Sequence, residues 1–326
     1  MPILSARIDR FATKAAFTIS RGAKHHVDVL SVTLTDGRHQ GHGEGTAIYY
    51  HGDSAEAALA TAQSAAPALA AGATRADLLT LLPPGAARNA IDAALWDLEA
   101  KQSGHRVWQL LGLPRPRPLL TAYTISLGTP AAMAAAAHAA RHRELLKLKL
   151  GGEGDRDRVS AVRAAAPDAR LIADANEAWG ALDIEAETHA LAAFHVELIE
   201  QPVPAGQDHL LDGVRPAIPL AADESCHTRE SLDAIVGRYR FINIKLDKAG
   251  GLTEALALLH AAKQRGLGVM TGCMLSTSLG IAPAFMIAMQ GSHADLDGPL
   301  LLATDRPHGL RFSGSDVEPP TVELWG

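Results

Sequence analysis

The pattern of hydrophobic and polar positions changes partway along the chain. From Leu119 onward, short apolar runs alternate with longer stretches of helical periodicity, which is typical of parallel strands joined by crossover helices. Strands are predicted near 120–126, 145–150, 170–174, 196–200, 218–223, 241–245, 267–272 and 293–296. The Ala-rich run 131–140 and the stretch 278–290 lie between strands and are predicted to be crossover helices. Eight strands are what a closed (β/α)₈ barrel needs.

The first part of the chain has a different pattern. Segments 2–10, 12–19 and 27–35 alternate polar and apolar residues, and a turn at Asp36-Gly37 precedes the run 38–47. This predicts an antiparallel meander. Two later stretches, 54–71 and 87–103, are rich in Ala and Leu with helical spacing. Residues 1–113 are therefore predicted to form an α+β capping domain.

The remaining boundaries follow from proline. The segment PRPRP (114–118) is predicted to be a linker, with the barrel domain extending over 114–303. The tail, 304–326, contains three prolines and the strand-like TVELW (321–325), and we expect it to return to the capping domain. The predicted fold class is α/β: a (β/α)₈-type barrel with an N-terminal α+β capping domain that the C-terminal tail completes.

Composition excludes several kinds of partner. A net charge of −6 and a pI near 6.2, without a basic cluster, argue against nucleic acid. No apolar run reaches the roughly 18 residues of a membrane-spanning helix, and the N-terminus has no cleavage site, so a cytoplasmic protein without membrane contact is predicted. Two cysteines, Cys226 and Cys273, are too few for a disulfide framework.

Ionisable residues stand at the ends of five successive predicted strands: Lys149, Asp174, Glu200, Asp223 and Lys245. One charged residue at a strand end is ordinary, but five in register predict a shared site at the C-terminal face of a barrel, where such enzymes carry their chemistry. Three converging carboxylates would repel one another unless a hard dication held them, which points to Mg²⁺. A lysine on each side of that metal suggests proton transfer from two directions.

These motifs make the chain resemble the dipeptide epimerases of the muconate-lactonizing subgroup of the enolase superfamily. The resemblance covers nearly the whole chain and rests on KLKL (147–150), ADANEAW (173–179), IEQPVP (199–204), ADES (222–225), NIKLDKAGGLTEAL (243–256), GCMLSTS (272–278) and DLDGPL (295–300). The lysine and carboxylate motifs are shared across the subgroup, so they specify the half-reaction but not the substrate. The Asp-x-Asp of 295–297 is the epimerase-like element.

The resemblance implies a Mg²⁺-dependent isomerase that inverts the α-carbon of the C-terminal residue of a dipeptide, with L-Ala-L-Glu and L-Ala-D-Glu as the expected pair, in cell-wall peptide metabolism. Removing a proton beside a carboxylate creates a second negative charge, so the enediolate needs a stabilising cation. Lys149 and Lys245 would act on opposite faces of that carbon. Lys147, two residues before Lys149 on the same side of the strand, would lower the pKa of that neighbour and contact the substrate carboxylate.

The resemblance also implies residues that select the substrate. Asp295 and Asp297 would hold the ammonium group of the dipeptide, and Thr124 would contribute to substrate binding. The alternative for DLDG is a polar turn. Arg21, in the loop SRGAKHH (20–26), would pair with the glutamate side chain, although a surface arginine can also be merely solvated. This loop and AIYYHGDS (47–54) are expected to cap the barrel mouth.

Other functions stay open at this point. A muconate cycloisomerase or an o-succinylbenzoate synthase would share the bases and ligands but would have little use for the two strand-eight acids. An epimerase of another dipeptide fits equally well. An acid-sugar dehydratase would need a histidine-containing base dyad, which the sequence lacks, and a non-catalytic binding protein would not need two bases around one metal. The expected partner is a small dipeptide, and the sequence leaves open whether the chain forms a homo-oligomer.

Overall fold

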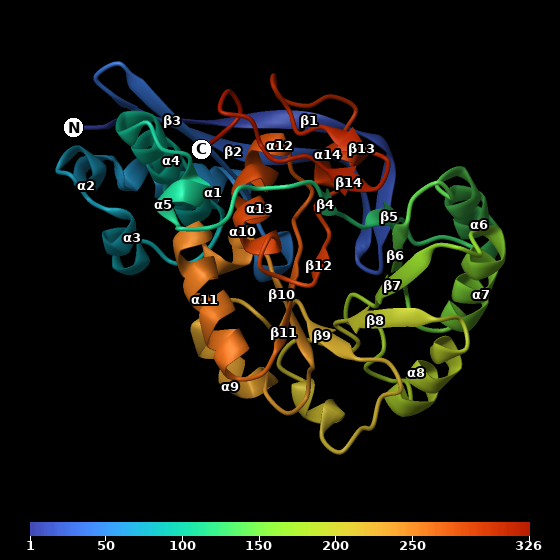
Figure 1. Cartoon of the computed structure of the whole chain (residues 1–326). Helices are drawn as coiled ribbons and strands as arrows, with labels where there is room; N and C mark the ends of the chain where they lie inside the picture. The colour runs from blue at the N-terminus through green and yellow to red at the C-terminus, as the bar shows by residue number, and fades with distance from the viewer.

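An antiparallel sheet lies against one end of an eight-stranded parallel sheet in the computed structural model, which describes residues 1–326 (Figure 1). The antiparallel sheet consists of β1 (Ile3–Ile19), β2 (Gly22–Asp36) and β3 (His39–Thr46), in that order. The two strands predicted at 2–10 and 12–19 are one strand. Its register with β2 shifts between Ala12 and Phe17, because a bulge bends the chain there without ending the strand.

Helices pack against the antiparallel sheet to form the cap. They are η1 (Tyr49–His51), α1 (Ala55–Ser64), α2 (Ala66–Ala70), α3 (Arg75–Leu81), α4 (Ala86–Ser103) and α5 (Val107–Leu110). The longest of them, α4, lies directly on β3, where Gly41, Gly43 and Gly45 share one face. A Cβ at these glycines would lie 2.0, 2.0 and 2.2 Å from backbone carbonyl oxygens of α4, so only glycine permits this approach.

The parallel sheet is the predicted barrel, and all eight strands are confirmed. They are β5 (Tyr123–Ile125), β6 (Leu145–Lys149), β7 (Arg170–Asp174), β8 (Val196–Glu200), β9 (Leu220–Ala222), β10 (Phe241–Ile244), β11 (Gly268–Thr271) and β12 (His293–Ala294). Each strand is hydrogen-bonded to the next in sequence order. The two edges of the sheet meet where the Ala122 N–H donates to the Ala294 carbonyl at 2.8 Å.

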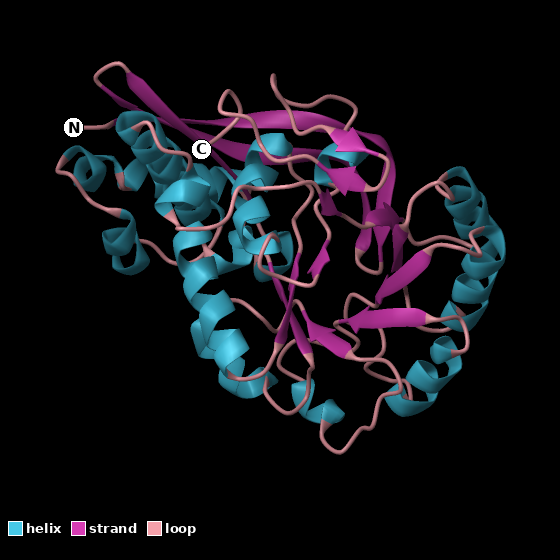
Figure 2. Ribbon diagram, viewed as in Figure 1, coloured by secondary structure: helices cyan, strands magenta, loops and turns pink.

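The crossover helices lie outside the ring of strands (Figure 2). They are α6 (Pro130–Ala139), α7 (Asp155–Ala165), α8 (Ile184–Ala192), η2 (Asp208–Leu211), η3 (Arg229–Ser231), α9 (Leu232–Ile235), α10 (Leu246–Ala249), α11 (Leu252–Gln264), α12 (Ser278–Ile281), η4 (Ala282–Ala284) and α13 (Phe285–Ala288). One further helix, α14 (Gly298–Leu301), follows the last strand. The helix predicted over 278–290 is divided into α12, η4 and α13, because Pro283 lacks the N–H that a continuous helix needs.

Apolar side chains fill the barrel beneath the ionisable residues. This buried cluster contains Ala122, Leu145, Ile172, Leu198, Ala221 and Met270. Side chains two positions apart on a strand point to the same side, so Asp174 points into the barrel as Ile172 does. The same spacing relates Glu200 to Leu198. The strand pattern therefore directs the acids to the barrel axis, above an apolar floor.

The tail returns to the cap, as expected, but not as a strand at 321–325. Its strands are β13 (Phe312–Ser313) and β14 (Asp316–Val317), which pair with β4 (Leu119–Leu120). Residues 321–325 form a turn instead, and Trp325 is 1% exposed with its indole N–H donating to the Ala93 carbonyl of α4 at 2.9 Å. Leu324 and Trp325 are buried there, whereas Val322 is 47% exposed.

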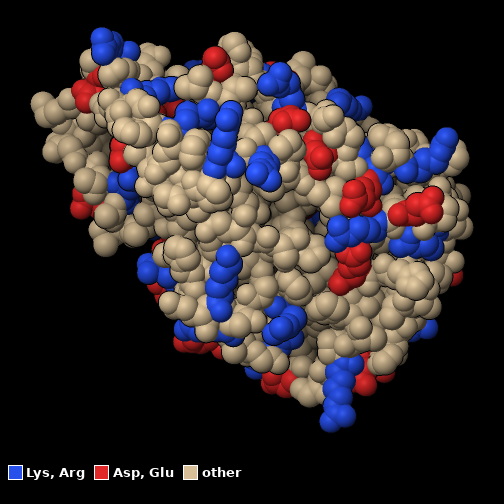
Figure 3. All heavy atoms as spheres, viewed as in Figure 1, with Lys and Arg blue, Asp and Glu red and all other residues tan.

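Charge is dispersed over the surface. On the face drawn in Figure 3, basic and acidic side chains are interspersed and no extended basic patch is visible. None of the helices has both the length and the apolar character that crossing a membrane requires.

Candidate active site

Three buried acids meet at the C-terminal ends of neighbouring barrel strands. Asp174 ends β7, Glu200 ends β8 and Asp223 follows β9, and each is at most 1% exposed. One carboxylate oxygen from each lies within 4.8 Å of the others. Three hard oxygen donors at this spacing, sheltered from water, fit a Mg²⁺ ion. The acids predicted as a ligand set are thus brought together.

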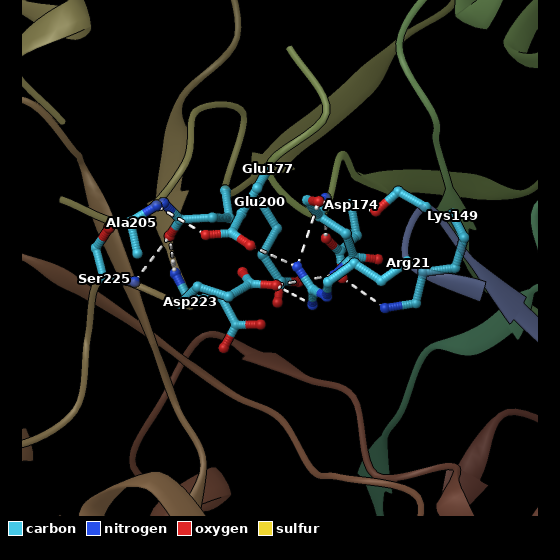
Figure 4. A network of polar contacts seen from close by, with 12 residues as sticks. Arg21, Lys149, Asp174, Glu177, Glu200, Ala205, Asp223 and Ser225 are labelled. Atoms are coloured by element: carbon cyan, nitrogen blue, oxygen red, sulfur yellow. Dashed lines mark hydrogen bonds and ion pairs between the residues drawn. The ribbon is translucent and has the colours of Figure 1, made fainter. Parts of the chain in front are cut away.

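Lysines flank this group of acids on both sides, and Figure 4 shows one of them, Lys149, beside Asp174. The Lys149 ammonium lies 2.6 Å from Asp174 Oδ2, and the Lys245 ammonium lies 2.6 Å from Asp223 Oδ2. The first comes from β6 and the second directly follows β10, so they approach from strands on either side of the three acid-bearing strands. This arrangement places an ammonium group at each flank of the acids.

Lys147 lies between the acids and the end of β12. Its ammonium is 2.7 Å from Glu200 Oε2, 2.7 Å from Asp295 Oδ2 and 3.2 Å from Asp174 Oδ2. Burial opposes its positive charge, but the charges of Asp295 and Glu200 raise its pKa well above the ordinary value. Lys147 is therefore a buried cation whose charge is balanced by the surrounding carboxylates.

The pKa values of the acids reflect their crowding. Burial alone would raise the pKa of Asp174, but the charges of Lys149 and Lys147 hold it below its ordinary value. Burial and the neighbouring Asp174 charge raise the pKa of Glu200 to about 8. Such opposed shifts within one cluster are characteristic of functional sites. For Lys245, burial is outweighed by the charge of Asp223, which raises the lysine pKa well above its ordinary value.

A fourth lysine at this site escaped the sequence analysis. Lys248 in α10 is 1% exposed, and its ammonium donates to Asp223 Oδ1 at 2.5 Å, to the Asp223 carbonyl and to the Asn243 carbonyl. It therefore holds one oxygen of Asp223 while Lys245 contacts the other. The sequence does contain a signal for Lys248, namely its spacing from Lys245. Residues three apart on a helical turn lie on the same face.

The turns that follow the acids have unusual backbone geometry. Asn176 and Glu177, after β7, have φ of 41° and 68°, and Gln201, after β8, has φ of 36°. Left-handed backbone at non-glycine residues costs on the order of 1 kcal/mol or more and clusters at functional sites. Here it turns the Asn176 N–H back to Asp174 Oδ1 at 2.9 Å. The turn thereby fixes the orientation of that carboxylate.

Asp295 and Asp297 follow β12, and Asp297 lies beside Thr124, the other residue predicted to bind substrate. The Thr124 N–H donates to Asp297 Oδ2 at 2.6 Å, and Asp295 contacts Lys147. Burial and the Asp295 charge raise the pKa of Asp297 to about 7. Asp295 Oδ1 is buried without a hydrogen-bond partner, so this pair retains an acceptor for a cationic group.

A cavity lies between the barrel mouth and the cap. Its lining from the cap includes Phe17, Ile19, Arg21, Lys24, Tyr49 and Tyr50, and its lining from the barrel includes Lys149, Asn176, Asp223, Glu224, Lys245, Cys273, Met274 and Leu275. The two cap segments expected to cover the mouth do so. The loop predicted at 20–26 is, however, only the turn Ser20–Arg21, because β2 already begins at Gly22.

Arg21 lies in the cavity wall but is already paired. One Nη atom is 2.7 Å from Glu177 Oε2 and the other is 2.5 Å from Glu224 Oε1, while the guanidinium carbon lies 4.6 Å from the Tyr50 ring centroid. The two acids and the ring hold it in place. The structure thus places Arg21 at the site, in contact with acids of its own chain.

Comparisons with known proteins agree with this geometry. Two family models match the chain, that of the mandelate racemase / muconate lactonizing enzyme N-terminal domain over residues 5–112 and that of the enolase C-terminal domain-like family over residues 131–320. Among curated proteins, an L-Ala-D/L-Glu epimerase of Escherichia coli K12 is 44% identical over 92% of this chain and 94% of that protein. An N-acetyl-D-glutamate racemase of a Pseudoalteromonas species is 45% identical over 77% of this chain and 79% of its own.

Solved structures give the same picture. An enolase family member from Agrobacterium tumefaciens with homology to dipeptide epimerases, with bound sodium and L-Ala-L-Glu, has a TM-score of 0.97 and 50% identity over 100% of both chains. A dipeptide epimerase from Enterococcus faecalis in complex with Mg and L-Leu-L-Tyr has a TM-score of 0.90 and 30% identity, and the match covers 98% of this chain and 97% of that one.

Proposed function

This chain belongs to the mandelate racemase/muconate lactonizing enzyme family of the enolase superfamily, and from that premise we propose that it interconverts L-Ala-L-Glu and L-Ala-D-Glu. The chain is an isomerase, as the resemblance implied. The observation that carries the proposal is the position of Lys149 and Lys245, which lie on either flank of three buried acids. Inversion at carbon needs a proton acceptor on one face and a donor on the other.

In this proposal Asp174, Glu200 and Asp223 hold one Mg²⁺ ion. When bound, the ion would draw electron density from the substrate carboxylate and so acidify the adjacent α-hydrogen. The donor set supports this assignment, because all three ligands are carboxylates and all are buried.

The lysines then carry the proton. One of Lys149 and Lys245 must be neutral to accept the α-proton while the other is protonated to donate one, and their roles exchange for the reverse reaction. Lys147, the third lysine of the cluster, would contact the substrate carboxylate, since its ammonium already lies among carboxylate oxygens.

We assign the substrate's α-ammonium group to Asp295 and Asp297, with the Thr124 backbone holding Asp297 in place. The unpartnered Asp295 Oδ1 supports this assignment. It also favours a dipeptide over an N-acylated amino acid, the type of substrate that the Pseudoalteromonas relative's name gives, because an acylated nitrogen has no positive charge for the pair to bind. We keep Arg21 as a substrate-binding residue of the cavity wall. We also place the reaction in cytoplasmic metabolism of cell-wall peptides.

Proton exchange tests the proposal. The enzyme is incubated with Mg²⁺ and L-Ala-L-Glu in D₂O, and the α-hydrogen of the glutamate residue is followed by NMR. We expect that signal to disappear while L-Ala-D-Glu accumulates, and we expect N-acetyl-D-glutamate to exchange far more slowly. If the acylated amino acid exchanges and the dipeptide does not, the assignment of the two strand-eight acids is wrong.

A further inference from the structure

The edge strand β1 has backbone hydrogen-bond groups that no other strand of the chain uses. β1 pairs with β2 on one side only, and the register is continuous from Ile3 to Ala12. The Ala12 carbonyl faces the other side, where it accepts from the Ala303 N–H at 2.8 Å. Alternate residues of a strand direct their N–H and C=O groups to the same side. Four residues before Ala12 therefore face away from β2 without a strand beside them: Leu4, Ala6, Ile8 and Arg10.

The opposite edge of the same sheet is closed by side chains. On β3, the His42 N–H donates to Asp97 Oδ2 and the Thr46 N–H donates to Asp247 Oδ1, both at 2.8 Å. The edge of β1 has no such cover over residues 4–10. A bare row of backbone donors and acceptors at a sheet edge is a template for pairing with another chain. This segment of β1 is therefore the place where the cap can accept a further strand.

The charges along β1 indicate which strand fits. Arg7 and Asp9 lie on one face of β1, on either side of Ile8, and the Arg7 side chain is 64% exposed. If two copies of β1 pair antiparallel around a two-fold axis at Ile8, Arg7 of each copy lies opposite Asp9 of the other, and opposite charges in this position are favourable. An axis at residue 7 or residue 9 would instead set like charges against each other. A second copy of this chain thus supplies a complementary strand in one preferred register.

We propose that β1 is a homodimer interface. The segments over residues 4–10 of two copies pair antiparallel, and the two three-stranded cap sheets become one continuous sheet. In this register Ile8 exchanges backbone hydrogen bonds with Ile8 of the other copy, and Ala6 does so with Arg10. The interface is isologous, as a two-fold dimer requires. It involves none of the residues assigned to the active site, so it is independent of the proposed function.

Sedimentation velocity over about a hundredfold range of protein concentration tests the interface. We expect the wild type to shift from monomer to dimer as the concentration rises. Ile8→Pro removes one N–H per copy from the shared ladder and should weaken the dimer at least about tenfold, while the monomer loses no hydrogen bond to β2. Arg7→Glu sets two acids opposite each other and should also weaken the dimer. Arg215→Glu, which reverses the charge of an exposed arginine outside the cap, should leave it unchanged.

Cysteine cross-linking tests the register. The Cα atoms of a hydrogen-bonded antiparallel pair lie about 5.5 Å apart, which a disulfide can span. With oxidised glutathione, Ile8→Cys should therefore form a covalent dimer. Arg10→Cys lies opposite Ala6 of the other copy and should form no more covalent dimer than the wild type, which has two cysteines of its own. A wild type that stays monomeric at every concentration, a dimer that Ile8→Pro leaves unchanged, or cross-linking of Arg10→Cys as fast as that of Ile8→Cys would overturn the proposal.

Discussion

At the scale of single residues, each lysine that we propose as a base is also the counterion of an acid that we propose as a metal ligand. Lys149 lies 2.6 Å from Asp174, and Lys245 lies 2.6 Å from Asp223. Removing either lysine therefore takes away a proton carrier and leaves a buried carboxylate with one cation fewer. A test of catalytic role must therefore distinguish the loss of proton transfer from the loss of folding. Exchange of the α-hydrogen of one enantiomer does so, because an unfolded variant would exchange neither.

We predict that Lys149→Ala and Lys245→Ala each lower epimerisation by at least about a hundredfold, because proton transfer by a placed group contributes about 10²–10⁴. The remaining lysine should still exchange the α-hydrogen of one enantiomer, and the two variants should differ in which one. NMR in D₂O with L-Ala-L-Glu and L-Ala-D-Glu measures both. Lys263→Ala, an exposed lysine of α11, is the control. Native interconversion by either base variant would refute the two-base assignment.

A second prediction concerns the metal ligands. Glu200→Gln replaces a charged donor by a weaker neutral one, so Mg²⁺ affinity measured by calorimetry should fall at least about tenfold. Glu197→Gln is the matched control on the same strand, since Glu197 lies near the start of β8, at the opposite end from Glu200, and pairs with Arg170 at 2.8 Å. Equal Mg²⁺ affinity in the wild type and Glu200→Gln would remove this residue from the ligand set.

At the scale of elements, the sequence-based prediction is most accurate for buried strands that end in a charged residue. The barrel strands were located within a few residues because each apolar run is short and bounded, and the ionisable residues at 149, 174, 200, 223 and 245 follow from that register. The N-terminal strand was divided wrongly because a bulge and a turn both interrupt alternation. TVELW alternates like a strand, yet only Leu324 and Trp325 are buried, and Trp325 donates to α4 from a turn.

The residues that sequence reasoning missed depend on distant partners. The sequence predicts a loop at Lys24, but this residue lies on β2, and its environment comes from Tyr49 and from the barrel across the cavity. Lys248 looks like a solvated helix residue until α10 is packed against Asp223. Such roles arise from contacts between elements, which local periodicity does not encode.

A contact between two helices leads to the third prediction. Asp92 on α4 of the cap accepts hydrogen bonds from Thr253 of α11, from N–H at 3.0 Å and from Oγ1 at 2.5 Å. Burial raises the Asp92 pKa to about 6, although these bonds oppose the shift. Between the ordinary pKa of about 4 and this value, the folded chain holds a proton that the unfolded chain has released. Raising the pH through this window therefore favours unfolding.

The contribution of Asp92 should be fully present below pH 4 and lost as the pH passes about 6, and it amounts to about 3 kcal/mol from a shift of about two pKa units. Urea unfolding from pH 4 to 7 measures it. Asp92→Asn keeps the size of the side chain but cannot titrate, so its stability should change less over this range. Parallel pH profiles for the two proteins would contradict the prediction.

At the scale of the whole molecule, one arginine of the tail joins the cap sheet to the barrel. Arg306 contacts Asp9 at 2.7 Å and Glu44 at 2.8 Å, and it donates to Ser31 Oγ at 2.5 Å. Glu44 is 1% exposed and also accepts from the Thr277 N–H of the barrel at 2.9 Å. Cap, barrel and tail thus share one buried acid. Because the substrate cavity lies between cap and barrel, this junction also supports the cavity.

The last prediction follows from that shared acid. Arg306→Met leaves Glu44 buried without its cation, and breaking a buried pair in this way costs about 3–5 kcal/mol, which chemical denaturation would measure. Burial already raises the Glu44 pKa against the effect of Arg306, so the variant should favour the protonated acid further. The double variant Arg306→Met/Glu44→Gln removes the orphaned charge and should regain part of the loss. Arg311→Met, an exposed arginine of the same tail, should unfold like the wild type. A double variant no more stable than the single one would show that Arg306 acts through packing rather than through the charge of Glu44.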